Sequence, residues 1–529
     1  MARIWAAPSD RPAAQLVARR GGQSLALAVL CTLLFLTFLD STIVSVVLGD
    51  VQSSLHADVA DLQWVVCAYT LTFASIMLAC GMIGDELGRK KVMLAGAAVF
   101  CAGSVLSALA PNVQTLIAGR AVMGLGAAAS EPGTLSMLRQ LFPDDRERSR
   151  AIGVWAATSG FALAAGPLIG GILVGLWSWR AIFWFNLLFG LATLVAAAMI
   201  LPESADPSAA RVDTAGTILG AGGLATLVFG IIDAETAGFA SPLVIALFCV
   251  SVVLIVAFCL WERRAAHPLL DLRYLRVPAF TTGNIAAFCT YFATFAIFFF
   301  TALYLVEVVG ASGFRLAVVF LPMTALMIVA SLLAGRWTAL AGPRWSIAAG
   351  CVLFAGGLLF ANNYLNPSPD YVPLAISLGI AGIGIGTTVV PITSAVMSAV
   401  PAERSGMAAS AANTSRVVGA ATGVAVLGSL VNSQLRDSLV GQMNHLRIPV
   451  GFQGLVINAI ETGSIPKDTA QYAGFGKLVQ EVIGAAYQAF HHGLHAALYL
   501  SAGLALFAGL LAVITLRPRP EPVRSNAEA

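Results

Sequence analysis

Residues 24–49 read SLALAVLCTLLFLTFLDSTIVSVVLG, and this stretch decides the class of fold. Asp40 is its only charged residue. A helix rises about 1.5 Å per residue and the hydrocarbon core of a bilayer is about 30 Å thick, so this stretch is long enough to cross a membrane once. A transmembrane β-strand would be shorter and would alternate between apolar and polar side chains. The stretch therefore predicts a transmembrane helix.

Further runs of the same character follow along the chain, separated by short polar connections. Only helices and closed barrels satisfy every backbone hydrogen bond inside a bilayer, and these runs lack the alternation of barrel strands. We therefore expect an all-α polytopic membrane protein with 14 transmembrane helices. The predicted spans are 24–49, 62–84, 92–109, 113–137, 150–176, 181–202, 214–232, 241–261, 279–305, 314–335, 344–363, 371–398, 407–432 and 489–516.

The composition of the whole chain agrees with this class. Of 529 residues, 58% are hydrophobic and 11% are charged, whereas soluble domains contain about 45–50% apolar and about 25% charged residues. These values exclude a string of soluble domains and a disordered chain. A net charge of +3 gives no reason to expect a nucleic-acid partner. The eight cysteines lie in apolar runs without a C-x-x-C pair, which is typical of buried small side chains.

The distribution of basic residues indicates the orientation in the membrane. Most of the 30 Lys and Arg residues fall in connections on the side of the N-terminus, and the short connections on the other side carry only Arg180 and Arg315. Cytoplasmic loops carry such an excess of positive charge. We therefore expect both termini in the cytoplasm, with tails at 1–23 and 517–529 and a long outer loop at 433–488.

A weak internal repeat divides the chain into two halves. The matching positions are Gly124, Gly126 and Pro132 with Gly384, Gly386 and Pro391, and Gly81, Gly88 and Arg89 with Gly335, Gly342 and Arg344. Secondary transporters build a midplane site from such repeats. We expect two pseudo-symmetric six-helix bundles, at 24–203 and 279–516, with two inserted helices and their linkers at 204–278.

Two charges of opposite sign are predicted at similar depth in the first bundle. Asp40 lies about 24 Å along the first helix, and Arg120 lies about 10 Å below the outer surface in the fourth helix. A charge inside a bilayer costs at least about 2.5–3.5 kcal/mol, and pairing reduces this cost. We expect an Asp40–Arg120 ion pair. The pair is either a fixed structural contact, or Asp40 is a carboxylate whose proton affinity depends on whether Arg120 is near.

Glu131 and Arg416 are also predicted within the membrane. Glu131 shares a helix face with Arg120 and precedes a helix-kinking Pro132. Burial favours the neutral form of a carboxylic acid, which suits reversible protonation; alternatively, Glu131 is solvated at the cytoplasmic mouth. Arg416 either lines a cavity or reaches the inner interface. In the repeat, Arg120 matches Ile380, so its charge belongs to one half only.

Other chemical patterns in the sequence give no site. His491 and His495 have the i, i+4 spacing of metal ligands, but no carboxylate or cysteine lies nearby in sequence, so we expect no metal. The glycines of residues 382–386 lack the strand and acidic partner of a nucleotide site and favour close helix packing. No P-loop, G-x-S-x-G or H-E-x-x-H pattern occurs. We expect neither a cofactor nor an enzyme.

Several segments together resemble the major facilitator superfamily, specifically its fourteen-helix drug–proton antiporter branch. Residues 81–91, GMIGDELGRKK, are similar to its gating-loop motif, and LIAGRAVMGLGAAASEP resembles the motif that the family links to proton transfer. AGPLIGG at 165–171 resembles the antiporter motif G-P-x-x-G-G, and LDSTIVSVVL resembles the first helix of the branch. The motif positions in this chain are Gly81, Gly84, Asp85, Gly88, Arg89 and Lys90 for the gating loop, and Gly166, Pro167, Gly170 and Gly171 for the antiporter motif.

The resemblance implies a proton-coupled exporter of lipophilic or cationic small molecules that works by alternating access in the cell membrane. Asp40, Arg120 and Glu131 would couple protons to transport, and we expect a monomer. The alternatives are a dedicated exporter of an endogenous lipid, siderophore or antibiotic, and a non-transporting membrane sensor or scaffold. The candidate cavity residues are Trp64, Tyr69, Tyr291, Phe292, Tyr304, Asn413 and Arg416, although aromatic side chains in helices often serve packing instead.

Overall fold

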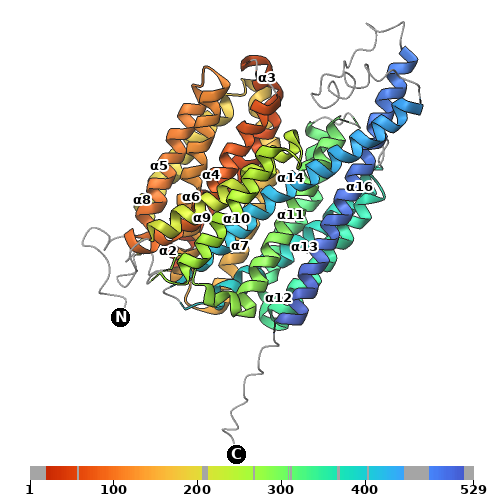
Figure 1. Ribbon diagram of the computed structural model, residues 1–529. Helices are drawn as coiled ribbons and strands as arrows, with labels where there is room; N and C mark the ends of the chain where they lie inside the picture. The colour runs from red at the N-terminus through yellow and green to blue at the C-terminus, as the bar shows by residue number, and fades with distance from the viewer. Residues whose placement is uncertain are drawn as a thin grey trace, which may run out of the picture.

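The computed structural model describes residues 20–204, 213–265, 268–307, 313–365, 370–401, 404–445 and 476–516, together with residue 309 and without residues 56 and 58. All regular secondary structure within these ranges is helical (Figure 1). Most of the predicted tails, and residues 446–475 of the predicted outer loop, lie outside the described residues.

Eight helical elements build the first part of the chain. They are α2 (Arg20–Ile43), η2 (Val44–Val47), α3 (Leu48–Leu55), α4 (Val59–Leu87), α5 (Arg89–Ala108), α6 (Val113–Leu141), α7 (Asp145–Leu176) and α8 (Ala181–Ile200). Polar side chains cap two of the starts: Asn112 accepts a hydrogen bond from the backbone N–H of Thr115, and Asp144 accepts one from that of Glu147. The first predicted span, 24–49, is not one continuous α-helix: after α2 the chain passes through the short 3₁₀ segment η2 into α3.

The remaining elements follow in the same way. They are α9 (Thr214–Ala237), α10 (Pro242–Glu262), η3 (Leu272–Arg276), α11 (Pro278–Glu307), α12 (Gly313–Asn362), α13 (Tyr371–Ser398), α14 (Ser405–His445) and α16 (Gly476–Thr515). Gly342, at φ 76° and ψ 164°, breaks α12 into two helices. Gly88, between α4 and α5, also has a positive φ of 107°. These two glycines are matching positions of the predicted repeat, so both halves turn at the same point.

The predicted spans correspond to helices throughout the described residues. Nine described helices are long and apolar enough to cross a membrane, or ten if a bent segment within α4 is included. The count of 14 therefore stays a prediction. The largest differences flank the predicted 433–488 loop: α14 continues to His445 and α16 begins at Gly476, so both ends of that loop are helical. Polar residues in these ends obscured the continuation of the helices in the sequence.

The helices pack as two bundles with α9 and α10 beside them (Figure 1). In the first bundle α6 packs against α4 and α5, and α2 against α7 and α8; in the second, α12 packs against α13 and α16, and α11 against α14 and α16. The bundles meet where α7 contacts α12 and where α4 and α6 contact α14. Helix α9 contacts α4, α14 and α10. The inserted pair thus lies along one side of the boundary between the bundles.

Glycine contacts define the register of the repeat more closely than the sequence motif did. A Cβ atom on Gly126 would clash with the backbone of Phe100, and one on Gly384 would clash with that of Phe354. Gly126 is therefore equivalent to Gly384, whereas the sequence match paired it with Gly386. The residue equivalent to Arg120 becomes Leu378 in place of Ile380. Its position is still apolar, so the asymmetry of charge remains.

One end of the bundle collects both ends of the described chain. Helix α2 begins there and α16 ends there (Figure 1). Gln23, at the start of α2, donates from Nε2 to the carbonyl of Leu141 at the end of α6. At the end of α16 the Thr515 hydroxyl lies 2.6 Å from that of Thr282. We call this end of the molecule the terminal face.

Candidate functional site

The predicted ion pair between Asp40 and Arg120 is present in the interior of the first bundle. Nη1 of Arg120 lies 2.5 Å from Oδ2 of Asp40, and both side chains are at most 1% exposed. The second carboxylate oxygen accepts a hydrogen bond of 2.7 Å from Nδ2 of Asn186 on α8. Three helices, α2, α6 and α8, thus meet at one buried carboxylate.

Arg120 is held in a fixed orientation by further contacts. Its Nε donates to the carbonyl of Val65 at 3.0 Å, and its Cζ lies 4.6 Å from the ring centroid of Tyr69. The Tyr69 hydroxyl in turn donates to the carbonyl of Thr37, one turn before Asp40. We call Asp40, Arg120, Asn186 and Tyr69 the Asp40 cluster. It lies wholly within the first bundle, so a change in its charge acts first on the packing of α2, α4, α6 and α8.

A second polar cluster lies where the two bundles meet. Arg416 on α14 donates from Nη1 to Oδ1 of Asn413 at 2.8 Å and from Nη2 to the hydroxyl of Thr393 on α13. Its Cζ lies 5.3 Å from the Trp155 ring on α7 and 5.5 Å from the Tyr291 ring on α11. The guanidinium therefore contacts aromatic side chains from both bundles.

Glu131 belongs to this second cluster, and its surroundings decide between the two interpretations of the sequence. It is 1% exposed and lies one helical turn before Thr134, whose hydroxyl accepts a hydrogen bond from the indole N–H of Trp155 in this cluster. Glu131 is therefore buried at the boundary of the bundles and is not a solvated residue at the mouth. Arg416 is also 1% exposed, which excludes the interpretation that it reaches the interface with water.

The candidate cavity residues do not form one site. Tyr291, Asn413 and Arg416 come together in the second cluster, whereas Tyr69 belongs to the Asp40 cluster. The other three pack elsewhere. The Trp64 ring lies 5.0 Å from that of Phe229 on α9, Phe292 packs against Gly423 on α14, and Tyr304 lies 5.9 Å from the His491 ring on α16.

The gating-loop motif forms the turn between α4 and α5 at the terminal face. Asp85 and Arg89 form an ion pair of 2.7 Å one helical turn apart. The backbone N–H of Lys90 donates to Oε1 of Glu203 after α8, and a Cβ on Gly88 would lie 2.6 Å from that atom. Gly84 packs against Arg89, and Gly81 is buried in the same helix. The turn is thus fastened within the first bundle by Glu203, a residue that the motif does not contain.

The antiporter motif lies in α7, and its glycines differ in their surroundings. A Cβ on Gly166 would clash with the Thr42 hydroxyl and approach the backbone N of Ile43 to 3.0 Å. This contact lies directly before η2, where the helix of Asp40 changes to a 3₁₀ geometry. Gly170 is buried, whereas Gly171 is exposed and has open space around it. Pro167 also lies in α7. The close approach of α7 to α2 depends on Gly166, the first residue of the motif.

Contacts at the terminal face join the two bundles. Arg139 on α6 donates to the carbonyl of Met397 at 3.0 Å and to that of Val400 at 3.2 Å, both at the end of α13. Nearby, Arg404 directly before α14 pairs with Asp271 of the linker before α11 at 2.6 Å, which joins this linker to the second bundle and not to the first. Sequence reasoning missed these residues because Arg139 binds backbone carbonyls, which no side-chain pattern indicates.

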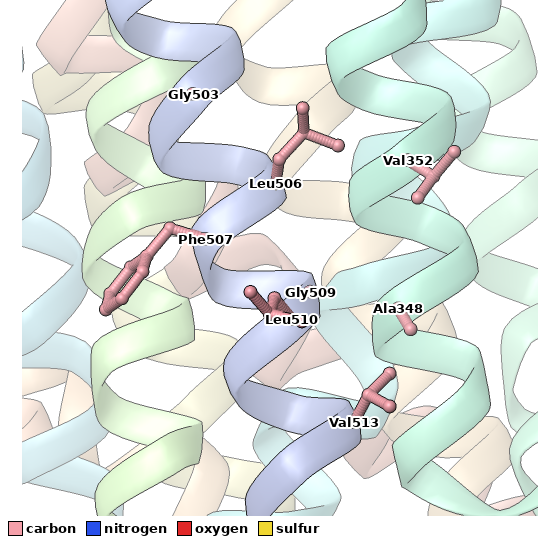
Figure 2. A pocket seen from close by; sticks show the side chains of 8 residues that line it. All are labelled: Ala348, Val352, Gly503, Leu506, Phe507, Gly509, Leu510 and Val513. Carbon is pink, nitrogen blue, oxygen red and sulfur yellow. The ribbon is translucent and has the colours of Figure 1, made fainter.

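Two other features do not belong to either cluster. The rings of His491 and His495 lie within hydrogen-bond distance, with 2.9 Å between their Nε2 atoms, and no group of three metal ligands occurs in the described part of the chain. A groove of about 510 Å³ runs between α12 and α16 and is lined only by apolar residues, including Val352 and Leu506 (Figure 2). It offers no polar group to a charged substrate.

The chain is similar to known proteins along most of its length. Residues 30–424 match the Major Facilitator Superfamily. Multidrug resistance protein Stp of Mycobacterium tuberculosis is 34% identical over 77% of this chain and 75% of its own length. The tetracenomycin C resistance and export protein of Streptomyces glaucescens is 30% identical over 91% of this chain and 90% of its own. The crystal structure of the human organic anion transporter MFSD10 (TETRAN) has a TM-score of 0.59 at 16% identity, covering 95% of this chain and 99% of that one.

Proposed function

This chain belongs to the Major Facilitator Superfamily, and from this membership we propose that it is a proton-coupled exporter of lipophilic or cationic small molecules. The family and its relatives make the chain a multi-pass membrane transporter and not an enzyme. The names of two relatives refer to drug resistance, and one of them to export. These names support drug-like molecules as the substrates.

The observation that carries the proposal is the buried Asp40–Arg120 pair. A buried ion pair is a costly structural device, and removing the charge of one partner leaves the other uncompensated, which costs about 3–5 kcal/mol. Protonation of Asp40 therefore leaves Arg120 in an unfavourable environment until the surrounding helices rearrange. A proton bound at Asp40 would in this way change the relative stability of two conformations of the transporter.

The proposed cycle follows from this change in stability. A proton that enters from outside neutralises Asp40 and favours the conformation open to the cytoplasm. Substrate then binds between the bundles while the proton leaves to the cytoplasm, and the restored ion pair favours the conformation closed at the terminal face. Contacts of Arg139 with α13 hold the terminal face together in the described structure. We propose that this face is cytoplasmic, with both termini there and the protein monomeric in a bacterial cell membrane.

A dedicated export function is the second candidate. The relative that matches 91% of this chain is named for resistance to tetracenomycin C and for its export. By the same mechanism this chain would remove one antibiotic or another endogenous product in place of many drugs. The number of chemically unrelated substrates separates the two candidates.

Uptake into everted membrane vesicles tests the proposal. Vesicles that contain the protein are given an inward-acidic pH gradient and offered ethidium, a fluoroquinolone and tetracenomycin C. We expect gradient-dependent accumulation that nigericin abolishes. Accumulation of several unrelated compounds indicates multidrug export, and accumulation of one indicates a dedicated exporter. Accumulation that persists without a pH gradient would contradict proton coupling.

A further inference from the structure

Arg416 is enclosed by side chains that commonly bind cations. Trp155 comes from the first bundle and Tyr291 from the second, and both ring centroids lie within about 6 Å of the guanidinium carbon, the range of a cation–π interaction. Trp155 is fully buried and Tyr291 is 6% exposed. The positive charge of Arg416 thus lies close to two aromatic rings and away from water.

Glu131 adds an acceptor to these surroundings. Its Oε2 atom is buried and has no hydrogen-bond partner among the described residues. A buried carboxylate oxygen without a donor is unfavourable by about 1–3 kcal/mol or more. Glu131 lies one helical turn before Thr134, whose hydroxyl binds the Trp155 indole N–H. This oxygen is therefore available to a positively charged group or a donor that enters the boundary between the bundles.

Aromatic faces and a carboxylate are the groups that recognise organic cations in proteins. We call Trp155, Tyr291 and Glu131 the cation cage. Trp155 is held in place because its indole N–H donates to the Thr134 hydroxyl at 3.0 Å. Three different helices of the two bundles contribute to the cage, so its geometry depends on how the bundles are packed together.

We propose that the cation cage binds the positive charge of an organic-cation substrate, and that Arg416 occupies the cage while the substrate is absent. The inference rests on the proposed export function, to which it adds a binding site for those substrates that are organic cations and a role for Arg416. Arg416 acts as a tethered competitor, held by Asn413 and Thr393 on its own bundle. A substrate cation displaces it and meets the rings and carboxylate that the guanidinium had occupied. The empty transporter thereby avoids an unoccupied cage.

Equilibrium binding of tetraphenylphosphonium to the purified full-length protein tests this inference. This probe is a permanent lipophilic cation and cannot donate a hydrogen bond. Arg416→Gln removes the tethered charge and retains an amide near Asn413, and we expect it to lower the Kd about tenfold. Arg416→Lys should keep the Kd of the unmodified protein. Arg180→Ala is the matched control, because Arg180 also lies over a tryptophan, 4.2 Å from the Trp179 ring, but outside the cage.

Trp155→Leu separates occupation of the cage from simple repulsion between charges. If Arg416 and the probe compete for the same ring, Trp155→Leu weakens binding more in the Arg416→Gln background than in the unmodified one. If Arg416 only repels cations from a distance, the effect of Trp155→Leu is absent in both backgrounds. Neutral triphenylphosphine oxide should bind equally with and without Arg416.

An unchanged or higher Kd for Arg416→Gln, or equal effects of Trp155→Leu in the two backgrounds, overturns the proposal. If Arg416→Gln does not fold, Arg416→Met takes its place, and an unchanged or higher Kd then has the same meaning. Binding needs no pH gradient. A failure of proton coupling in vesicles therefore leaves this result unaffected, and a failure of the cage leaves proton coupling intact.

Discussion

Asp40 has exchanged its hydration for protein donors, and each donor comes from a different helix. Arg120 supplies charge from α6, and Asn186 supplies an amide from α8. The Asp40–Arg120 pair was predictable because the depth of each residue in its helix follows from the sequence. Asn186 was not, because its position within an apolar run does not indicate which carboxylate it meets. The same holds for Trp155, one of many aromatic residues in the chain.

The amide of Asn186 gives the first prediction at this scale. Asn186→Leu keeps the size of the side chain and removes the donor to Asp40, and a hydrogen bond to a charged group contributes about 1.5–3 kcal/mol. We expect the free energy of unfolding, measured by titration with SDS in mixed micelles, to fall by about that amount. Asn363→Leu, at an exposed position, serves as the control. Equal unfolding midpoints for the two variants would show that Asp40 does not depend on this amide.

The second prediction concerns the shape of Arg120. Its guanidinium serves Asp40 and the carbonyl of Val65 with two different nitrogens. A lysine carries the same charge but has one compact ammonium group and no planar fork. We expect Arg120→Lys to lower the initial rate of gradient-driven uptake at least about tenfold, and Arg180→Lys to leave it unchanged. Uptake by Arg120→Lys at the unmodified rate would mean that charge alone suffices.

At the scale of elements, the antiporter motif brings α7 close to the helix of Asp40. Gly166 allows this approach, whereas a Cβ on Gly171 of the same motif would have no atom of the described residues within 4 Å. We expect Gly166→Ala to lower both thermal stability and gradient-driven uptake, because its methyl group meets the Thr42 hydroxyl and the backbone of Ile43. Gly171→Ala should match the unmodified protein in both measurements. Equal effects of the two substitutions would contradict the assignment of the close contact to Gly166.

The elements themselves were largely predictable, and their ends were not. Runs of about 20 apolar residues indicate helices because a bilayer demands them. The repeat paired Gly88 with Gly342, although only the structure shows that the chain turns at both. The ends of α14 and α16 continue beyond the apolar runs into polar sequence, where hydropathy gives no signal. The register of the repeat also differed, because Gly126 and Gly384 are related by helix crossings and not by the motif letters.

At the scale of the whole molecule, the two bundles are joined by contacts that sequence patterns do not reveal. Glu131 and Arg416 were each predicted within the membrane, with contact to water left open for both, and nothing in the chain indicated that α6 and α14 lie in contact. Arg139 provides the contact at the terminal face through carbonyls of α13. In the proposed cycle this contact breaks when the terminal face opens.

Arg139 gives a prediction for this opening. Arg139→Gln removes the charged donor to Met397 and Val400, so the terminal face should open more often. We expect faster maleimide labelling of a cysteine placed at Val400, which is only 4% exposed, measured against the same protein without that cysteine. Arg146→Gln, at an exposed position on α7, should leave the rate unchanged. A labelling rate that Arg139→Gln does not raise would show that other contacts keep the face closed.

Asp40→Asn in proteoliposomes tests the central claim most directly. The amide keeps the size of the side chain and cannot bind and release a proton. We expect this variant to exchange labelled substrate for unlabelled substrate across the membrane at equal pH, and to lose accumulation driven by a pH gradient. If Asp40→Asn still accumulates substrate with full dependence on the gradient, Asp40 does not carry the coupled proton and the proposed mechanism is wrong.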